Sequence, residues 1–515
     1  MLLATALAAV SLSMSQPSDP AIQAVVAQGV LVGREADGIT AFKGVPYAEA
    51  PIGPLRWRMP QPAPHWEGQR EAGEVGAICI QPPANGDPGV GPPPMSEDCL
   101  NLNVWAPSER AGPLPVMVWI HGGGLNNGSG TAALYDGRRL AGRGVVVVTV
   151  NYRLGRLGFF AHPALRDTAA DGDDARGNFG IADLVASLEW VRDNIAAFGG
   201  DPANVTIFGE SAGGAAVTRL MIAPQARGLF HRAVVQSGLG REQGTPSFIR
   251  RADGGPSLED RGVLFALSTG LPLNASAEDL RALPAEAMLT PAPSFYGGDL
   301  LVIDGRMVAD EVANAFAAGR QAPVPFIIGT NSAEFWWMKA TDRSPYGQTD
   351  DALTRSEFAA LIQAYGGEDA YNGNALSDFI FNEPARHLAR LHARAGHPTY
   401  LYRFDVVPDP NPEPQHEGAT HASERPYVFD TLSTTGWPMG ERDQAASTAM
   451  ADYWTTFARS GDPNGVGRPQ WPEFGRARDQ LLEFTNDGPV AKPVPFAERL
   501  DLIEAFYARV GADRR

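Results

Sequence analysis

Three stretches of this chain are continuously apolar or β-branched instead of alternating between apolar and polar residues. They are Val116 to Ile120, Val145 to Val150 and Val205 to Phe208. Strands that are buried on both faces have such runs, so these three are predicted to be central parallel strands. Shorter apolar runs predict further strands at residues 30–32, 39–42, 102–105, 233–236, 326–329 and 399–404.

One helix is predicted between the second and third central strands, over Asp183 to Phe198. Its apolar residues follow a 4-3-4 spacing that forms one buried stripe, and two glycines end it: Leu184, Leu188, Val191, Ile195, Gly199 and Gly200. Strands that alternate with helices indicate an α/β fold with a doubly wound sheet. Residues 240–325 and 335–395 mix helical and loop patterns and are expected to form lobes over the site. With no internal repeat and no charged linker, residues 16–515 are expected to form one large domain.

The composition and net charge of the chain exclude some classes of function. The 515 residues are 44% hydrophobic and 20% charged, which is ordinary for a globular protein with a large core. The formal net charge is −17 and no cluster of Lys or Arg occurs. Nucleic acid and anionic membranes are therefore not expected as partners.

The N-terminus has the pattern of a signal peptide. Residues 1–14 are an uncharged apolar run, too short to span a bilayer, and Ser13-Met14-Ser15 is a small-x-small cleavage site. We therefore predict a signal peptide over residues 1–15 and a secreted or periplasmic protein. The alternative is a buried N-terminal helix.

Cys79 and Cys99 are the only two cysteines. A zinc or iron–sulfur site needs more ligands than these. Two cysteines that flank a Pro/Gly-rich loop suit a disulfide in an oxidising compartment, and the alternative is a pair of buried thiols.

Candidate chemistry begins at Gly209-Glu210-Ser211-Ala212-Gly213, which follows an apolar strand and precedes a small-residue helical segment. Strand, sharp turn and helix form the context of a nucleophile elbow, in which Ser211 would be the nucleophile. The neighbours two positions from that serine must be small, as Gly209 and Gly213 are. The alternative is a glycine-rich turn that happens to contain a serine.

A second glycine run, His121-Gly122-Gly123-Gly124, directly follows the strand that ends at Ile120. Consecutive glycines allow backbone N–H groups to face a developing oxyanion. The expected donors are the N–H groups of Gly123, Gly124 and Ala212. His121 is expected to position this loop, and the alternative for the glycines is a flexible turn.

A serine nucleophile also needs an acid and a base, which follow it in that order in this kind of fold. Glu334 lies just past the strand at 326–329 and fits the acid, although a surface carboxylate would look the same. Downstream, His387 and His392 lie on an Arg-rich helical stretch and are expected to be solvated. His397 precedes the last predicted strand, at its wrong end, whereas His416 and His421 both follow that strand and fit the base equally well.

Seven motifs are spread over nearly all of the chain that follows the expected signal peptide. They are FKGVPYAEAPIGPLRW, SEDCLNLNVWAP, HGGG, VVVVTVNYRLGRLGFF, GNFGIADLVASLEWVRDNIAAFGGDPANVTIFGESAGG, THASERPYVF and YWTTFARSGDPN. Together they resemble the type-B carboxylesterases, the group that includes the cholinesterases. The resemblance implies an α/β-hydrolase fold, with Ser211 as nucleophile, Glu334 of GTNSAE as acid and His421, not His416, as base. It also implies a Cys79–Cys99 disulfide and buried ion pairs that join Arg56 to Glu97 and Arg153 to Asp183. It requires no metal and no organic cofactor.

The chain departs from that family at two places. Glu334 is followed by Phe335-Trp336-Trp337, where a glycine is common, so the local packing is expected to differ. The loop between the two cysteines has no aromatic residue, whereas cholinesterases place a cation-binding tryptophan there, so choline esters are not expected to be preferred. Phe159, Phe295, Trp336 and Trp337 are candidate wall residues of the substrate site, although packing in the core is the expected role of each.

Taken together, the motifs predict a serine carboxylesterase that hydrolyses small-molecule esters through a Ser211-Glu334-His421 triad and an acyl-enzyme intermediate. Glu210, beside the nucleophile, would tune the field around His421 without being a member of the triad. The alternatives are an amidase or peptidase that uses the same triad, or a non-catalytic binding protein like some relatives of the cholinesterases.

Overall fold

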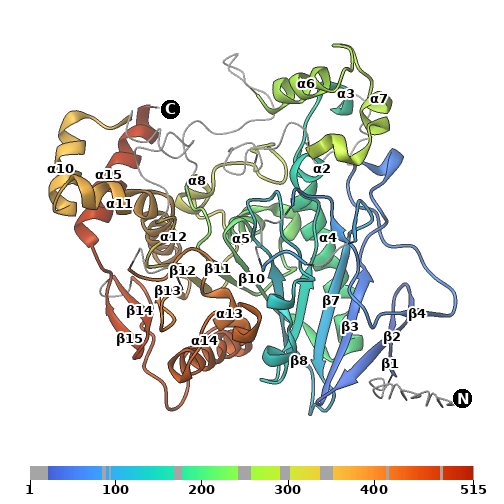
Figure 1. The fold of residues 1–515 in the computed structure, drawn as a ribbon, viewed down its shortest axis with the longest axis horizontal. Coiled ribbons are helices and arrows are strands. Elements are labelled where there is room, and N and C mark those ends of the chain that lie inside the picture. The colour runs from blue at the N-terminus through green and yellow to red at the C-terminus, as the bar shows by residue number, and fades with distance from the viewer. Residues whose placement is uncertain are drawn as a thin grey trace, which may run out of the picture.

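Among the described residues, 13 strands form one sheet that crosses the whole molecule in this computed structural model (Figure 1). The strand order is β1-β2-β3-β7-β9-β8-β10-β11-β12-β13-β14-β15, and β4 pairs with β2. The structure describes residues 21–83, 88–91, 94–166, 177–241, 257–289, 302–336, 352–412, 417–475 and 479–513.

The centre of the sheet is parallel from β9 through β8, β10, β11, β12 and β13 to β14. The strands are β8 (Leu114–Ile120), β9 (Val146–Val150), β10 (Gly200–Glu210), β11 (Arg232–Gln236), β12 (Phe326–Asn331), β13 (Thr399–Asp405) and β14 (Gln480–Thr485). The three predicted central strands are confirmed as β8, β9 and β10, although β8 begins two residues earlier than predicted, β9 one residue later and β10 five residues earlier. Their continuous apolar runs are explained by burial of both faces.

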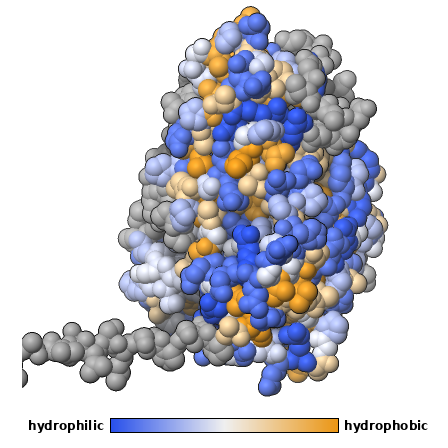
Figure 2. Space-filling view, turned by 90° about the vertical axis from the view of Figure 1, so that its right-hand side faces the viewer, coloured by the Kyte–Doolittle hydropathy of each residue, from blue (hydrophilic) through white to orange (hydrophobic). Residues whose placement is uncertain are grey.

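Both edges of the sheet are antiparallel. The strands are β1 (Ala21–Val26), β2 (Gly29–Ala36), β3 (Ile39–Pro46), β4 (Gln69–Glu71, parallel to β2), β7 (Asn101–Pro107) and β15 (Gly488–Pro493). Exposed and buried positions alternate along most of β1, as expected for a strand with one face in water. On the side of the molecule that carries β1 to β4, Figure 2 shows small apolar groups among hydrophilic residues.

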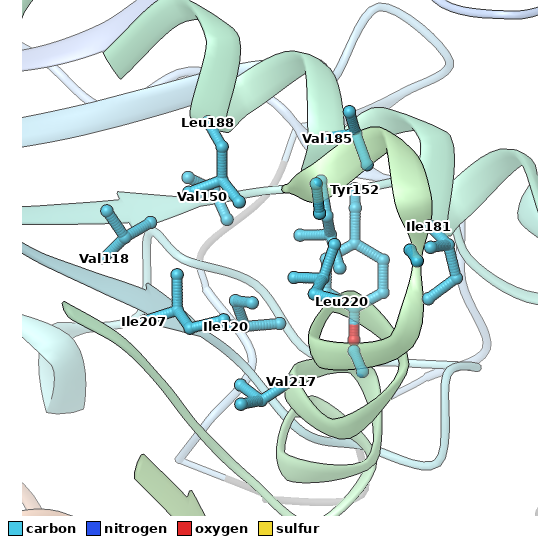
Figure 3. Close-up of a cluster of buried hydrophobic side chains, with 14 of the residues drawn as sticks. Val118, Ile120, Val150, Tyr152, Ile181, Val185, Leu188, Ile207, Val217 and Leu220 are labelled. Carbon is cyan, nitrogen blue, oxygen red and sulfur yellow. The ribbon is translucent and has the colours of Figure 1, made fainter. Parts of the chain in front are cut away.

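Each face of the sheet has its own core. Ile207 packs with Leu188 of α4 and Val217 of α5 (Figure 3), whereas the next residue, Phe208, belongs to the core that contains Trp454 of α14. Alternation along the strand thus sends consecutive side chains into different layers. The helices are α1 (Arg138–Ala141), α2 (Gly155–Gly158), α3 (Pro163–Arg166), α4 (Phe179–Asn194), α5 (Ala212–Ile222), α6 (Leu258–Ser268), α7 (Ala277–Ala282), α8 (Val312–Ala317), α10 (Arg355–Tyr365), α11 (Glu368–Ser377), α12 (Glu383–Arg394), α13 (Arg425–Phe429), α14 (Glu441–Ser460) and α15 (Ala497–Asp513).

The helix predicted over residues 183–198 exists with different bounds. It begins at Phe179 and ends at Asn194, and a 3₁₀ turn continues over Ile195–Phe198. Gly199, in the left-handed region with a φ of 81°, ends that turn as predicted. Most residues of the helix Phe179–Asn194 are buried, including Trp190 and Asp183. The expectation of a single buried stripe was therefore too narrow.

The prediction that His387 and His392 are solvated is wrong. His392 of α12 is fully buried, with Nε2 2.8 Å from the carbonyl oxygen of Val324, and burial lowers its pKa to about 4. His387 is partly buried, with Nδ1 3.1 Å from a carboxylate oxygen of Glu504. The Arg-rich sequence was misleading because the arginines of this helix pair with acidic residues of the C-terminal segment.

The two regions expected to form lobes contribute α6 to α8 and α10 to α12, and their role over the site stays a prediction. Several predictions fall outside the described residues: the signal peptide at 1–15, and His416, Phe295 and Trp337. Within the described part of the chain, none of the helices combines the length and the apolar character needed to cross a membrane.

Candidate active site

Ser211 occupies a sharp turn between β10, which ends at Glu210, and α5, which begins at Ala212. Its φ of 54° and ψ of −123° are strained for a residue with a side chain. The turn is crowded: a Cβ atom on Gly213 would lie 2.1 Å from the carbonyl oxygen of Ile120, and one on Gly209 would lie 2.7 Å from the backbone of Gly213. The strand–turn–helix prediction is therefore confirmed, together with the need for glycine on both sides of the serine.

The structure brings the three predicted triad residues together. Nε2 of His421 is 2.9 Å from Oγ of Ser211, and its Nδ1 is 2.5 Å from Oε2 of Glu334. Glu334 is fully buried, and the His421 side chain is 10% exposed. A parallel bridge between Ala333 and Thr420 joins the two loops, which places the acid and the imidazole side by side.

The second oxygen of Glu334 is also occupied. Its Oε1 accepts hydrogen bonds from the hydroxyl of Ser237 at 2.5 Å and from the backbone N–H of Asn331 at 2.8 Å. Ser237 follows β11 and Asn331 ends β12, so the ends of two neighbouring strands hold the acid. Nothing in the sequence marks Ser237 as part of this site except its place directly after a predicted strand.

Two further buried carboxylates surround the imidazole. Oε1 of Glu210 is 3.3 Å from Nε2 of His421, and burial raises the pKa of Glu210. Glu424 accepts hydrogen bonds from Gln236 at 3.0 Å and from the side chain of Asn331 at 2.7 Å, and burial raises its pKa as well. Burial opposes the charged form of His421, but the charges of Glu334 and Glu210 outweigh it and raise the pKa of His421.

Two aromatic rings flank His421. The ring centroid of Phe335 is 4.7 Å from that of the imidazole, and that of Phe381 is 5.0 Å away. Phe335 has a φ of 44°, in the left-handed region that favours glycine. The ring of Phe335 packs against the imidazole, and a difference in packing from the family at this position stays a prediction.

The glycine run at 122–124 lies against the serine turn. A Cβ atom on Gly122 would lie 3.1 Å from Cβ of Ser211. Gly123 and Gly124 have φ values of 99° and 61°, and neither backbone N–H donates a hydrogen bond to any residue that the structure describes. Two backbone donors without an acceptor among the described residues thus lie in the loop that Gly122 brings against Ser211.

His121 makes the contacts of a residue that holds this loop. Its ring stacks on Tyr152 with centroids 4.5 Å apart, and its Nδ1 is 2.8 Å from the carbonyl oxygen of Gly122. The hydroxyl of Tyr152 donates to the carbonyl of His121 at 2.8 Å. These contacts agree with the positioning role expected from the sequence.

Known proteins are similar to this chain in both sequence and fold. The Carboxylesterase family pattern matches residues 19–372 and 368–502. A fumonisin B1 esterase from Sphingopyxis macrogoltabida is 34% identical over 501 residues, which cover 91% of this chain and 87% of that protein. A cocaine esterase from Oryctolagus cuniculus is 36% identical over 481 residues, 85% of this chain and 86% of that protein. A solved PNB esterase structure has a TM-score of 0.80 at 30% identity and covers 93% of this chain and 99% of its own.

The chain belongs to the carboxylesterase family. The expected resemblance to type-B carboxylesterases is confirmed, as is the α/β-hydrolase fold with a large, mostly parallel sheet. The protein is a carboxylic ester hydrolase of the serine type.

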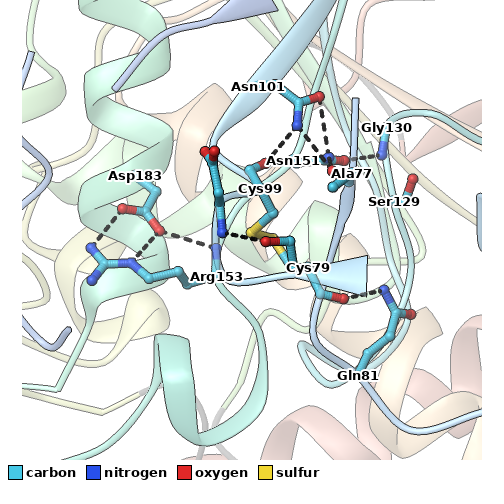
Figure 4. Close-up of a disulfide and its surroundings, with 12 residues drawn as sticks. Ala77, Cys79, Gln81, Cys99, Asn101, Ser129, Gly130, Asn151, Arg153 and Asp183 are labelled. Atoms are coloured by element: carbon cyan, nitrogen blue, oxygen red, sulfur yellow. Dashed lines mark hydrogen bonds and ion pairs between the residues drawn. A yellow bond between two sulfur atoms is a disulfide. The ribbon is translucent and has the colours of Figure 1, made fainter. Parts of the chain in front are cut away.

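The carboxylesterase has the disulfide expected from the family. Cys79 and Cys99 are bonded with their Cα atoms 5.0 Å apart (Figure 4). Both expected ion pairs are also present. Asp183 accepts from Arg153 at 2.7 Å in the interior, and Glu97 accepts from Arg56 at 2.6 Å. Figure 4 shows the Arg153–Asp183 pair close to the disulfide.

Among the described residues of the carboxylesterase, one group of three side chains has the spacing of metal ligands: Glu383, His387 and Glu504. Both carboxylates are already paired, Glu383 with Arg241 and Glu504 with Arg390. The group is therefore best described as part of an ion-pair network.

Proposed function

We propose that Ser211, His421 and Glu334 are the catalytic triad of this esterase. The observation that supports this most directly is the continuous chain of hydrogen-bond distances from the serine hydroxyl through both ring nitrogens to a buried carboxylate. A serine hydroxyl is a poor nucleophile until a neighbouring base removes its proton. Here Nε2 takes that proton, and Glu334 holds Nδ1–H and stabilises the imidazolium that forms.

In the first half-reaction Ser211 attacks the carbonyl carbon of the ester. The negative charge that develops on the carbonyl oxygen is stabilised by the backbone N–H groups of Gly123, Gly124 and Ala212. Such donors act without reorganisation because the backbone already holds them, and losing one costs about 10²–10³ in rate. The imidazolium of His421 then gives its proton to the leaving alcohol, and the acyl-enzyme remains.

In the second half-reaction His421 accepts a proton from a water molecule that attacks the acyl carbon. The same oxyanion donors stabilise the second tetrahedral intermediate. Collapse of that intermediate releases the carboxylic acid and returns the proton to Ser211. Every proton in this cycle passes through Nε2, so no metal or organic cofactor is required.

Export is part of the proposal. The apolar segment at residues 1–15 and the Cys79–Cys99 disulfide both support a secreted or periplasmic enzyme, because disulfides persist in oxidising compartments. The family match over residues 19–372 and 368–502 supports a single catalytic domain after that segment. N-terminal sequencing of protein recovered from outside the cytoplasm would test both points.

The decisive experiment is hydrolysis of p-nitrophenyl esters from acetate to octanoate by the purified mature protein. We expect turnover that Ser211→Ala reduces by about 10⁶ in kcat, the size of loss seen when a triad serine is removed. Ser268→Ala, at an exposed position of α6, is the matched control and should retain full activity. Matched p-nitroanilides separate an esterase from an amidase. A folded wild-type protein without ester or anilide turnover would contradict the triad assignment.

A further inference from the structure

A cavity of about 330 Å³ lies beside β12, β13 and β14, bounded by α12 and the start of α15. Ser211 and His421 are not among the described residues that line it. Ser377 does line it, and its hydroxyl donates to the backbone carbonyl of Glu334. The cavity therefore lies on the backbone side of the acid, whereas the carboxylate of the acid points to the imidazole.

Arg499 lines this cavity and is only 9% exposed. Its guanidinium carbon lies 3.8 Å from the ring centroid of Phe496 and 4.4 Å from that of Tyr365. The guanidinium makes no hydrogen bond to any residue that the structure describes, and its nearest carboxylate oxygen, on Asp378, is 3.4 Å from Nε. Nε is buried without a hydrogen-bond acceptor, which is costly, so a ligand in the cavity that accepts from this guanidinium gains affinity by doing so.

The other two arginines of the lining and Asp378 already have hydrogen-bond partners. Arg403 is held by Glu483 at 2.6 Å, and Arg386 is held by two acidic residues. The oxygens of Asp378 accept from the hydroxyl of Tyr365 at 2.6 Å and from Asn382 at 2.8 Å. Arg499 is consequently the cationic group of this lining whose hydrogen-bonding capacity is left for a ligand.

We infer that this cavity is a second binding site, which takes a small organic monocarboxylate with an apolar body. A carboxylate matches the planar fork of a guanidinium through two parallel hydrogen bonds. Apolar side chains form part of the wall and suit the body of the ligand: Leu401, Leu481, Val494 and Leu500. Three acidic residues, Asp378, Asp405 and Glu417, also line the cavity, so a singly charged carboxylate is favoured over a doubly charged phosphate. The volume is at the small end of the range of ligand sites.

The rim of the cavity supports the same inference. Phe496 is 57% exposed although it is a large apolar side chain, and its φ of 55° lies in the left-handed region. Strained backbone at a non-glycine residue is concentrated at ligand sites. An exposed aromatic ring that already stacks on Arg499 can also cover the apolar part of a bound acid.

The test is titration of the folded, full-length mature protein with 4-fluorobenzoate, followed by ¹⁹F NMR. We expect saturable binding to one site, weakened at least tenfold in Arg499→Met. The neutral analogue 4-fluorobenzamide has nearly the same shape and should bind at least tenfold more weakly than the acid. Val494→Phe fills the cavity without changing Arg499 and should abolish binding, which keeps the test valid if Arg499→Met fails to fold. Arg442→Met, at an exposed ion pair, is the control and should bind normally.

Three results would overturn the inference. They are equal binding of the acid and the amide, unchanged binding in both cavity variants, or displacement of the acid by an equal concentration of inorganic phosphate. The titration is repeated after a phosphonate has capped Ser211. Binding that disappears on capping would place the acid in the active site and also overturn the inference. Mass spectrometry reports whether the cap forms, and failure to form would count against the triad and not against the cavity.

Discussion

The hydroxyl of Ser237 lies 2.5 Å from Oε1 of Glu334, on the side of the carboxylate that faces away from the imidazole. Ser237 comes directly after β11 and has a φ of 47°, a conformation that costs free energy for a residue with a side chain. Both carboxylate oxygens of Glu334 therefore have hydrogen-bond partners. One oxygen orients His421, and the other is tied to the scaffold.

Removing this tie should slow catalysis without unfolding the protein. We expect Ser237→Ala to lower kcat/KM by about 10- to 100-fold, because a hydrogen bond to a charged group contributes about 1.5–3 kcal/mol. Steady-state hydrolysis of p-nitrophenyl butyrate measures the change. Ser423→Ala is a matched control, since the Ser423 hydroxyl is also buried but makes no hydrogen bond to a described residue. Equal activity of Ser237→Ala and wild type would show that the N–H of Asn331 is sufficient to hold the acid.

The pH dependence should report the carboxylates around the base. Burial opposes protonation of His421, but the charges of Glu334 and Glu210 raise its pKa above the ordinary value. Protonated His421 cannot accept the serine proton, so kcat/KM should fall as pH decreases through a midpoint above about 6.5. Glu210→Gln removes a charge 3.3 Å from Nε2 and should move that midpoint to lower pH.

The profile is recorded from mildly acidic to alkaline pH with p-nitrophenyl acetate. Glu278→Gln, at an exposed position of α7, serves as control and should leave the midpoint unchanged. A midpoint that is the same in Glu210→Gln and wild type would mean that Glu210 carries its proton throughout the working range. The raised pKa of His421 would then be due to Glu334.

The sequence predicted the parts of the site that local chain geometry determines. The turn at Ser211 and the glycine loop at 122–124 are recognisable because short-range sterics require glycine at fixed spacings from a strand end. Local reasoning could not choose between His416 and His421, and family similarity favoured His421. In the structure, the position of His421 depends on a bridge between Ala333 and Thr420, which are far apart in the chain.

Long-range contacts also explain which features of the site and the fold could not be predicted from the sequence. Glu424 and Asn331 meet beside the triad although 93 residues separate them, and no local pattern links them. His392 was expected in solvent because arginines surround it in sequence, yet those arginines pair with the C-terminal segment and the imidazole faces the core. The strand β14 was missed because its short apolar run is distinguished only by its pairing with β13.

The proposed oxyanion loop, residues 122–124, offers a separate test. Gly123 has a φ of 99°, and a Cβ atom there would lie 2.2 Å from the carbonyl oxygen of Asn127. Gly123→Ala should therefore displace the loop and lower kcat by about 10²–10³, the loss expected when one oxyanion donor is removed. Gly68→Ala is the control for backbone strain alone, because Gly68 also has a positive φ, 73°, but has open space at the Cβ position. A large effect on KM with unchanged kcat would contradict a role in stabilising the transition state.

The Arg153–Asp183 pair should matter for stability and not for chemistry. Asp183 is fully buried and accepts three hydrogen bonds from Arg153, at 3.0, 2.8 and 2.7 Å. Asp183→Asn leaves the guanidinium without a counter-charge, so we expect the free energy of unfolding to fall by about 3–5 kcal/mol. Asp193→Asn breaks an exposed pair with Arg192, with both side chains about half exposed, and should cost less than about 1 kcal/mol. Urea unfolding monitored by tryptophan fluorescence compares the two variants. Similar losses in both would show that burial adds nothing to the inner pair.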